Sequence, residues 1–398
     1  MSLRDPSPLA LAAGGFLALA AAMGFGRFAY TAILPDMLAA GQLDGAGAGY
    51  LAASNFAGYL AGALLAASPY LSGSRSVWSV VGLVASAATT AAMGVTDSMF
   101  AFMLLRFAGG FASAIVLVFA TALVLDGVAL AGRNGLSAVH FAGVGFGICV
   151  SALAVHWLKG PDLWPEQWLV FGLFTILIAF ACVPLLRESG PKVPRSEFTP
   201  GKVGLDTRFI ALLISYGLFG FGYIITATFI TAIVRNSPEL APHETAVWFT
   251  VGLALMPSVW FWSQVSARTG PLIAYAIACM LEAAGVIASV SSSHPPAIFF
   301  AAVCLGGTFV GITAIGLVAA RMLPTADGTP RDARRVVALM TASFGIGQVL
   351  GPAVAGWLYG QTGDYLGASA VAAFLLIVSA AIVVWIAASL KRARLARA

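Results

Sequence analysis

The chain has 398 residues, of which 60% are hydrophobic and 9% are charged, and its mean hydropathy is +0.93. A soluble domain carries roughly 25% charged residues, so this composition excludes a soluble globular protein and indicates an integral membrane protein. The net charge of +5 does not indicate a nucleic-acid partner, because the basic residues fall in alternate loops, which is a membrane topology signal. We expect a lipid bilayer and no nucleic acid as partner.

Long apolar segments occupy most of the sequence. With about 20 apolar residues per membrane crossing, twelve spans are predicted, centred near residues 24, 58, 86, 112, 145, 177, 221, 254, 281, 308, 347 and 377. The stretch Leu9–Met23 resembles a secretory signal, but the apolar character resumes after Arg27 and the segment has a counterpart in the second half. We therefore expect a retained first span.

The segment from Arg187 to Arg208 divides six spans from six. It contains three prolines and eight charged residues, which is typical of a loop. We predict an N-terminal six-helix bundle over residues 1–187, a cytoplasmic linker over 188–207 and a C-terminal six-helix bundle over 208–398. The predicted fold class is an all-α membrane protein with twelve transmembrane helices in two pseudo-symmetric bundles.

Lysine and arginine concentrate in alternate loops and at both ends of the chain. With the N-terminus inside, the inner loops and tails hold 17 of the 21 basic residues, and only Lys159 and Arg235 lie in outer loops. This bias predicts two cytoplasmic termini in the inner membrane of the cell. The remaining two, Arg27 and Arg106, fall within spans.

Three glycine patterns of the first half recur in the same order in the second half. The pairs are Gly24–Gly26 with Gly220–Gly222, Gly109-Gly110 with Gly306-Gly307, and Gly143-x-Gly145 with Gly345-x-Gly347. Their offsets of 196, 197 and 202 residues are close to half the chain length. Such a pattern indicates a parallel duplication of a six-helix unit.

Twelve spans in a six-plus-six repeat, with a basic central loop and both ends inside, resemble the major facilitator superfamily over essentially the whole chain. The stretch GRFAYTAILPDM in the first span is similar to the first-helix signature of the YbfB/YjiJ-type branch. The resemblance implies a secondary active transporter whose two bundles rock around a central cavity. In this fold the first, fourth, seventh and tenth spans line that cavity.

The motifs of the superfamily are present in part. The fourth-helix pattern of an arginine followed by small residues is met by Arg106, Gly110, Ala112, Ser113 and Ala114, with Gly109 in place of the usual glutamine. The loop motif that normally holds an aspartate has alanine there in both copies, at Ala66 and Ala267. An antiporter-type Gly-x-x-x-Gly-Pro motif occurs at Gly347 to Pro352, where we predict close helix packing through small residues.

Arg27 and Arg106 are the strongest candidates for a binding site. A charged side chain inside a span costs roughly 2.5–3.5 kcal/mol by insertion scales, so each arginine requires a reason. At 1.5 Å per residue, Arg27 lies roughly 13 Å in from Asp36, and Arg106 lies at a similar depth. No acid occupies that depth in the cavity-lining spans. Planar guanidinium groups suit a carboxylate or phosphate, so we predict that both bind an anion. The alternative for Arg106 is a structural arginine bonded to backbone carbonyls.

Aromatic and polar residues accompany the two arginines at helical spacing or through the repeat. Tyr223, for example, aligns with Arg27 at the offset of 196 residues. Each of these side chains could also be satisfied within the helix bundle, and for a buried tyrosine or asparagine that is the commoner case. The predicted neighbours of the substrate are Tyr30, Asn55, Tyr59, Tyr223, Thr226 and Gln348.

Two further residues are candidates for coupling transport to protons. His140 in the fifth span can titrate near neutral pH or serve as a bonded core histidine, and Glu282 is the only acid centred in a span. Glu282 lies in the peripheral ninth span, where we expect local pairing or protonation. Exchange of anions, or a proton carried by the substrate, is therefore preferred over a dedicated protein carboxylate.

The function that best accounts for these features is secondary active transport of a small organic anion, coupled to protons or a counter-anion, by a protein that acts as a monomer. The alternatives are an efflux antiporter for amphipathic compounds and a membrane sensor without transport. An enzyme is not expected, since the four histidines are scattered and no nucleotide loop is present. The four cysteines lack metal or redox spacing, so we expect no metal and no cofactor.

Overall fold

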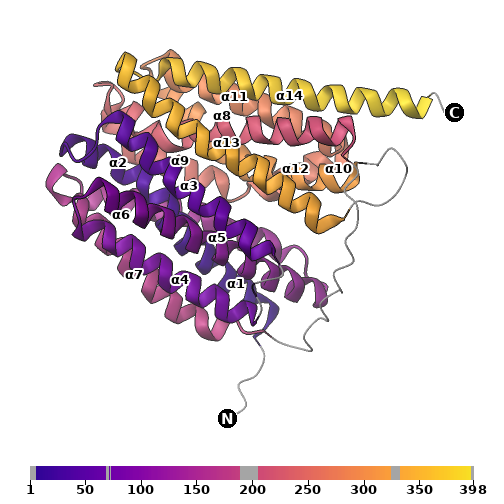
Figure 1. The fold of residues 1–398 in the computed structure, drawn as a ribbon, viewed down its shortest axis with the longest axis horizontal. Coiled ribbons are helices and arrows are strands. Elements are labelled where there is room, and N and C mark those ends of the chain that lie inside the picture. The colour runs from indigo at the N-terminus through magenta and orange to yellow at the C-terminus, as the bar shows by residue number, and fades with distance from the viewer. Residues whose placement is uncertain (1–5, 69–70, 72, 189–204, 324–331, 396–398) are drawn as a thin grey trace, which may run out of the picture.

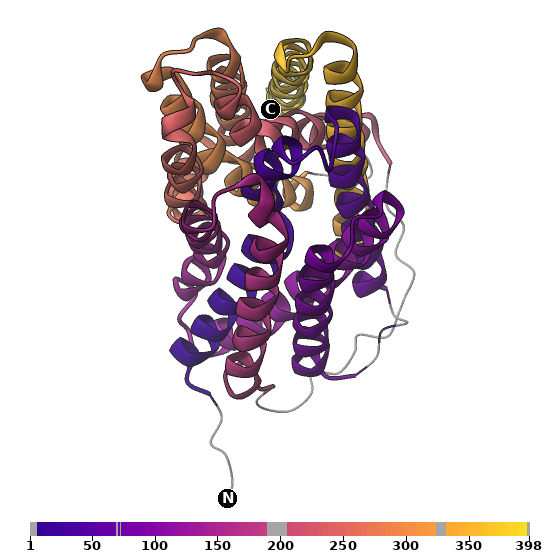
Figure 2. The ribbon, with the colours of Figure 1, turned by 90° about the vertical axis from the view of Figure 1, so that its left-hand side faces the viewer.

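The computed structural model describes residues 6–68, 71, 73–188, 205–323 and 332–395. Helices dominate these residues, and the described ranges contain no strand. The helices form two neighbouring groups, one from each half of the sequence (Figure 1). Figure 2 shows the first-half helices below and the second-half helices above.

The helices of the first half follow the predicted spans. The first span, Pro8–Ala39, is continuous over 32 residues, but its middle is π-helical rather than α-helical. The helices are α1 (Pro8–Leu19), η1 (Ala20–Phe28), α2 (Ala29–Ala39), α3 (Gly45–Ala67), α4 (Arg75–Ala92), η2 (Met93–Val95), α5 (Met99–Leu130), α6 (Leu136–Trp157), η3 (Pro161–Leu163) and α7 (Trp164–Leu185).

The second half repeats this arrangement with one broken span. Its helices are α8 (Thr207–Arg235), η4 (Ala241–His243), α9 (Glu244–Leu255), α10 (Ser258–Thr269), α11 (Pro271–Ser291), α12 (Pro295–Met322), α13 (Ala333–Thr362) and α14 (Leu366–Leu395). The helix α9 and its continuation α10 are bent by 47° around Pro257, which has no N–H to donate and therefore breaks a helix. In the described residues, eleven spans are long and apolar enough to cross a membrane, and the bent pair makes twelve.

The halves are joined between Leu185, where α7 ends, and Thr207, where α8 begins. Most of the predicted linker, residues 188–207, lies outside the described residues, so its cytoplasmic location stays a prediction. We call this side of the molecule the linker end. The opposite side, with the turns at Gly41, Gly160 and Gly363, is called the distal end.

Glycines bring backbones together at the predicted repeat positions. A Cβ atom at Gly347 would lie 2.1 Å from the carbonyl oxygen of Gly217, and one at Gly351 would lie 2.7 Å from that of Phe221. Such distances leave no room for a side chain, so α13 packs directly on α8. The packing interpretation of the Gly-x-x-x-Gly-Pro motif is confirmed.

The two halves meet along two further seams of small residues, α3 against α13 and α6 against α9. A Cβ atom at Gly49 would lie 2.3 Å from the carbonyl oxygen of Pro352, and one at Gly252 would lie 2.6 Å from that of Gly145. These distances leave no room for side chains, so the halves pack backbone to backbone at these positions.

Candidate functional site

A π-helical segment of the first span carries Arg27. The nine residues of η1 include Gly24 and Gly26, and both face close neighbours. A Cβ atom at Gly24 would lie 2.5 Å from the Cα of Gly147 on α6, and one at Gly26 would lie 2.5 Å from the Oγ of Ser86 on α4. Tight packing on both sides holds this irregular segment, of a kind that is frequent at functional sites.

The guanidinium of Arg27 is buried without an ionic partner. The residue is only 4% exposed, and its Cζ lies 4.2 Å from the ring centre of Tyr59 and 4.6 Å from that of Phe56. Its Nε and Nη2 have no hydrogen-bond acceptor among the described residues. These two atoms share one edge of the planar group, called here the Nε–Nη2 edge, which can hold a carboxylate through two parallel hydrogen bonds.

Arg106 lies at the same depth, as predicted, but it is bonded differently. Its Nη1 donates to the carbonyl oxygen of Gly26 at 3.1 Å, and its Nη2 donates to that of Arg27 at 3.3 Å. Its Nε has no acceptor in the described part of the chain, so Arg106 does not offer a complete edge. Of the two interpretations made from the sequence, these contacts correspond to the arginine bonded to backbone carbonyls.

Two of the predicted neighbours surround Arg106 rather than Arg27. The hydroxyl of Tyr30 donates to the carbonyl oxygen of Ala48 at 2.8 Å, and its ring centre lies 4.9 Å from the Cζ of Arg106. The amide Nδ2 of Asn55 donates to the carbonyl oxygen of Arg106 at 2.8 Å. Both side chains therefore help to hold Arg106 against the first span.

The other predicted neighbours lie at the centre of the molecule. Tyr59 on α3 packs against Arg27, whereas Tyr223 and Thr226 are buried on α8. Gln348 on α13 donates through Nε2 to the hydroxyl of Tyr223. The Oε1 of Gln348 and the Oγ1 of Thr226 have no partner in the described structure. Polar atoms of the second half thus remain available on its inner side.

The structure does not bring His140 to Arg27. The Nε2 of His140 lies 2.9 Å from the Oγ1 of Thr121, and its ring packs on Gly15, two turns into α1 from the linker end. Glu282 on α11 accepts a hydrogen bond from the Oγ1 of Thr308, which confirms the expected local pairing. Its Oε1 has no partner within the described ranges.

A network of four charges closes the distal end. Arg235 on α8 donates through Nε and Nη2 to the two oxygens of Glu244 at 2.8 and 2.7 Å. Its Nη1 donates to Asp36 of α2 at 2.5 Å, and Lys159 of the first half contacts Glu244 at 3.0 Å. Both cations fall in predicted outer loops, but the sequence alone does not pair them. The network ties the halves together twice.

Further bonds between the halves lie near this network. The Oγ1 of Thr31 donates to the carbonyl oxygen of Ala227 at 2.8 Å, and Thr231 donates back to the carbonyl oxygen of Thr31. At the linker end, by contrast, Arg75 bonds Asp126 and Glu188 of its own half. The distal end is therefore the side held closed by polar contacts.

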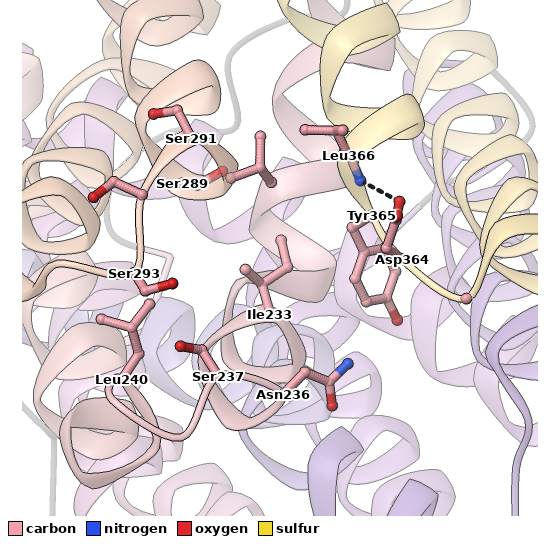
Figure 3. A pocket seen from close by; sticks show the side chains of 13 residues that line it. Ile233, Asn236, Ser237, Leu240, Ser289, Ser291, Ser293, Asp364, Tyr365 and Leu366 are labelled. Carbon is pink, nitrogen blue, oxygen red and sulfur yellow. Dashed lines mark hydrogen bonds between the residues drawn. The ribbon is translucent and has the colours of Figure 1, made fainter.

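The pocket in Figure 3 lies at the distal end of the second half and contains none of the predicted site residues. Its volume is about 540 Å³, and serines such as Ser289 and Ser293 line it. Its only charged lining residue, Asp364, accepts a hydrogen bond from the backbone N–H of Leu366 at 2.9 Å. Lacking a cation, this pocket is a poor site for an anion.

Sequence reasoning missed the rings that surround Arg27. Phe28 and Phe56 pack on the guanidinium from its own half, and Phe309 of the other half packs on Phe28. With 26 phenylalanines in the chain, most of them in apolar spans, a single ring carries no signal of its position. The helical spacing of Phe56 from the predicted Tyr59 was the available hint.

Two helical halves around a central arginine have the architecture of a major facilitator transporter. The fold is similar to a variant of the nucleoside transporter NupG, with a TM-score of 0.75 and 16% identity over 95% of this chain and 99% of that one. It is also similar to a bacterial homologue of the human lysosomal transporter Spinster in an inward-facing and occupied conformation, with a TM-score of 0.68 and 15% identity over 96% of each chain.

The family follows from the sequence itself. A family model described as uncharacterised MFS-type transporter YbfB matches residues 19–384, and the chain belongs to this family of membrane transporters. No curated protein sequence matches it. The predicted resemblance and fold class are confirmed, and neither the family nor the structural neighbours are enzymes.

Proposed function

We propose that this transporter moves a small organic anion with a carboxylate-like group, by alternating access between its two halves. The observation that carries the proposal is the Nε–Nη2 edge of Arg27, which is buried yet has no acceptor among the described residues. Burying an uncompensated charge is expensive. A carboxylate from the substrate supplies both the opposite charge and the two acceptors.

The other predicted residues take two roles in this proposal. Tyr59, Tyr223, Thr226 and Gln348 form the surroundings of the bound anion. Arg106, with Tyr30 and Asn55, acts as a positioning group, because its hydrogen bonds to the carbonyls of Gly26 and Arg27 hold the segment that carries the binding arginine.

Alternating access follows from the unequal ends of the molecule. We infer that the distal end faces outward in the inner membrane, with both termini cytoplasmic, because most basic residues lie in the opposite loops. With the distal network closed, substrate would reach the buried site from the cytoplasmic side once the halves separate there. A monomer contains both halves and the whole site.

An amphipathic efflux substrate is the second candidate, favoured by the rings packed around Arg27. A cationic compound would meet an uncompensated guanidinium and be repelled. An uncharged nucleoside, the substrate class of the structural neighbour NupG, would leave that charge uncompensated as well. An anionic group is therefore required of either candidate.

A binding screen tests the proposal. The purified protein is assayed by thermal stabilisation against carboxylates, sulfonates and cationic compounds. We expect stabilisation by anions only, and its loss in Arg27→Ala but not in Arg133→Ala, which removes an equal charge from an exposed loop. Stabilisation by cations, or by anions with equal strength in Arg27→Ala, would contradict the proposal.

Coupling is tested separately in liposomes. No carboxylate of the described chain contacts Arg27 or Arg106, so we favour anion exchange or a proton carried on the substrate. Exchange predicts counterflow into liposomes loaded with unlabelled substrate that exceeds uptake driven by a pH gradient, whereas a proton on the substrate predicts gradient-driven uptake that Glu282→Gln leaves unchanged. Strong gradient-driven uptake that disappears in Glu282→Gln and persists in His140→Ala would instead make Glu282 the coupling residue.

A further inference from the structure

Three rings of the first half pack against the guanidinium of Arg27. Its Cζ lies 4.2 Å from the ring centre of Tyr59, 4.6 Å from that of Phe56 and 5.2 Å from that of Phe28. The π face of a ring beside a guanidinium stabilises the cation without occupying its N–H groups. Since Nε and Nη2 have no partner in the described residues, this edge stays available within an aromatic wall.

Rings of the second half face this wall. The rings of Phe28 and Phe309 meet across the halves, with centres 5.8 Å apart. Behind this contact, Tyr223 stacks on Phe309 at 5.3 Å with an interplanar angle of 11°, and on Phe344 at 5.7 Å with an angle of 6°. When the halves separate at this contact to admit a substrate, the rings beside Arg27 border the opening on one side and Phe309 borders it on the other.

Charge and polar groups limit what can lie between these rings. Only one guanidinium offers a complete edge, because both Nη atoms of Arg106 are bonded to backbone carbonyls, so the site can hold one carboxylate through two parallel hydrogen bonds. In the second half, Gln348 bonds Tyr223, which stacks on Phe309. The Oε1 of Gln348 and the Oγ1 of Thr226 have no partner in the described residues. The amide oxygen of Gln348 can only accept a hydrogen bond, so it matches an O–H or N–H donor.

We infer that the substrate is a monocarboxylate joined to a planar ring, with a hydrogen-bond donor on the side of the ring away from the carboxylate. This inference rests on the proposed function, since it specifies the anion that Arg27 binds. The carboxylate lies on the Nε–Nη2 edge, the ring lies between the aromatic wall of Arg27 and Phe309, and the donor reaches Gln348.

Three probes of similar size test the inference on the purified full-length protein by calorimetry. They are benzoate, cyclohexanecarboxylate, which has the carboxylate and ring size but no flat face, and 4-hydroxybenzoate, which adds a donor. Benzoate should bind roughly 3- to 10-fold tighter than cyclohexanecarboxylate, the range that one aromatic pair provides beyond its buried area. 4-Hydroxybenzoate should bind tighter again.

Variants assign these differences to the rings and the amide. Phe309→Leu should reduce the preference for benzoate over cyclohexanecarboxylate, whereas Tyr59→Phe, which keeps the ring, should retain it. Phe300→Leu is the matched control, because Phe300 lies on the same helix as Phe309 but is 46% exposed. Gln348→Met should remove the advantage of 4-hydroxybenzoate without changing the affinity for benzoate by a comparable factor.

Two results would overturn the inference and are distinguishable. Equal affinity for benzoate and cyclohexanecarboxylate, with binding of both lost in Arg27→Ala, would contradict the requirement for a planar ring. It would leave the proposed transport of an anion standing. Binding of none of the panel carboxylates, in protein that is folded and monodisperse, would remove the proposed function together with the inference.

Discussion

Arg235 at the distal end and Arg27 at the centre present the same edge to different partners. The Nε and Nη2 of Arg235 both donate to Glu244, and its Nη1 donates to Asp36. The Nε and Nη2 of Arg27 have no acceptor in the described residues, although Arg27 is 4% exposed. The same chain thus neutralises Arg235 with its own carboxylates, whereas it surrounds Arg27 with aromatic rings.

The difference corresponds to two tasks. Arg235 joins elements of both halves, and a contact that holds a conformation gains from permanent, bidentate partners. A binding site that must release its ligand gains from a counter-charge that arrives and leaves with the substrate. The absence of an acidic neighbour beside Arg27, within the described residues, is therefore informative because the same protein supplies such neighbours where it needs a latch.

Removing the carboxylate that binds both Nε and Nη2 of Arg235 should have the largest effect on the closed distal end. Glu244→Gln leaves Arg235 with Asp36 as its acidic partner, and breaking the largely buried pair of Arg235 and Glu244 costs about 3 kcal/mol. The distal end should open more often, which is measured as faster maleimide labelling of a buried cysteine introduced by Thr231→Cys, with the native cysteines replaced.

The matched control for this experiment is Glu239→Gln, an exposed acid of the same turn that bonds only Ser237 among the described residues. Its labelling rate should equal that of the parent protein. If Glu244→Gln labels no faster than Glu239→Gln, the network does not hold the distal end closed.

Giving Arg27 a carboxylate of its own should make it resemble Arg235. Tyr59→Glu places an acid beside the guanidinium, whereas Tyr59→Gln has nearly the same shape without the charge. The Glu variant should be more stable than the Gln variant by about 1.5–3 kcal/mol, the scale of a charge-assisted bond, and should no longer bind anions. Thermal unfolding and a binding assay on the two variants provide the comparison. Equal stability would show that Arg27 does not lack a counter-charge.

Arg106 should respond as a positioning residue. Arg106→Lys can still reach one of the two carbonyls of Gly26 and Arg27, so its loss of anion affinity should correspond to about 1 kcal/mol, one ordinary hydrogen bond. Arg106→Ala should lose more anion affinity than Arg106→Lys does. A complete loss of binding in Arg106→Lys, equal to that in Arg106→Ala, would instead assign Arg106 to the anion directly.

The smallest effect is expected at the linker end, where Arg75 bonds exposed acids of its own half. Burial works to raise the pKa of Glu188, but hydrogen bonds and the charge of Arg75 prevail and hold this pKa below its ordinary value. A lowered folded pKa stabilises the protein above the unfolded pKa, and the contribution disappears as the pH falls through the folded value.

Glu188→Gln should therefore lower the free energy of unfolding at pH 7 by less than about 1 kcal/mol. This loss would appear as a slightly lower melting temperature. The difference from the parent protein should vanish as the pH is lowered through the acidic range. A difference that grows toward low pH would have the wrong sign for this account.

The sequence was sufficient for features that depend on composition along one segment. The lengths of the apolar segments predicted the spans. The cost of burying a charge identified Arg27 and Arg106 as candidate site residues. The sequence was insufficient for features that depend on how segments meet. The π-helix arises where Gly24 packs on another helix, and Glu244 finds Arg235 only because α8 ends and α9 begins at the same side.

The orientation of each guanidinium was also beyond sequence reasoning. Arg27 and Arg106 carry the same group at the same depth, yet one donates to two carbonyls and the other keeps an edge without acceptors in the described residues. Which of them faces carbonyls depends on side-chain paths through a packed interior, not on position along a helix. Because the spans are rich in phenylalanine, the sequence also does not predict which of these residues contact Arg27.

The most direct test of the central claim is the dissociation constant of one carboxylate, chosen from the binding screen, measured by calorimetry for four proteins: the parent, Arg27→Ala, Arg27→Lys and Arg133→Ala. We predict a roughly 10- to 150-fold weaker affinity for Arg27→Ala, corresponding to a charge-assisted bond of about 1.5–3 kcal/mol. Arg27→Lys should fall between, because an ammonium lacks the planar edge, and Arg133→Ala should match the parent. An unchanged dissociation constant in folded Arg27→Ala would contradict the account.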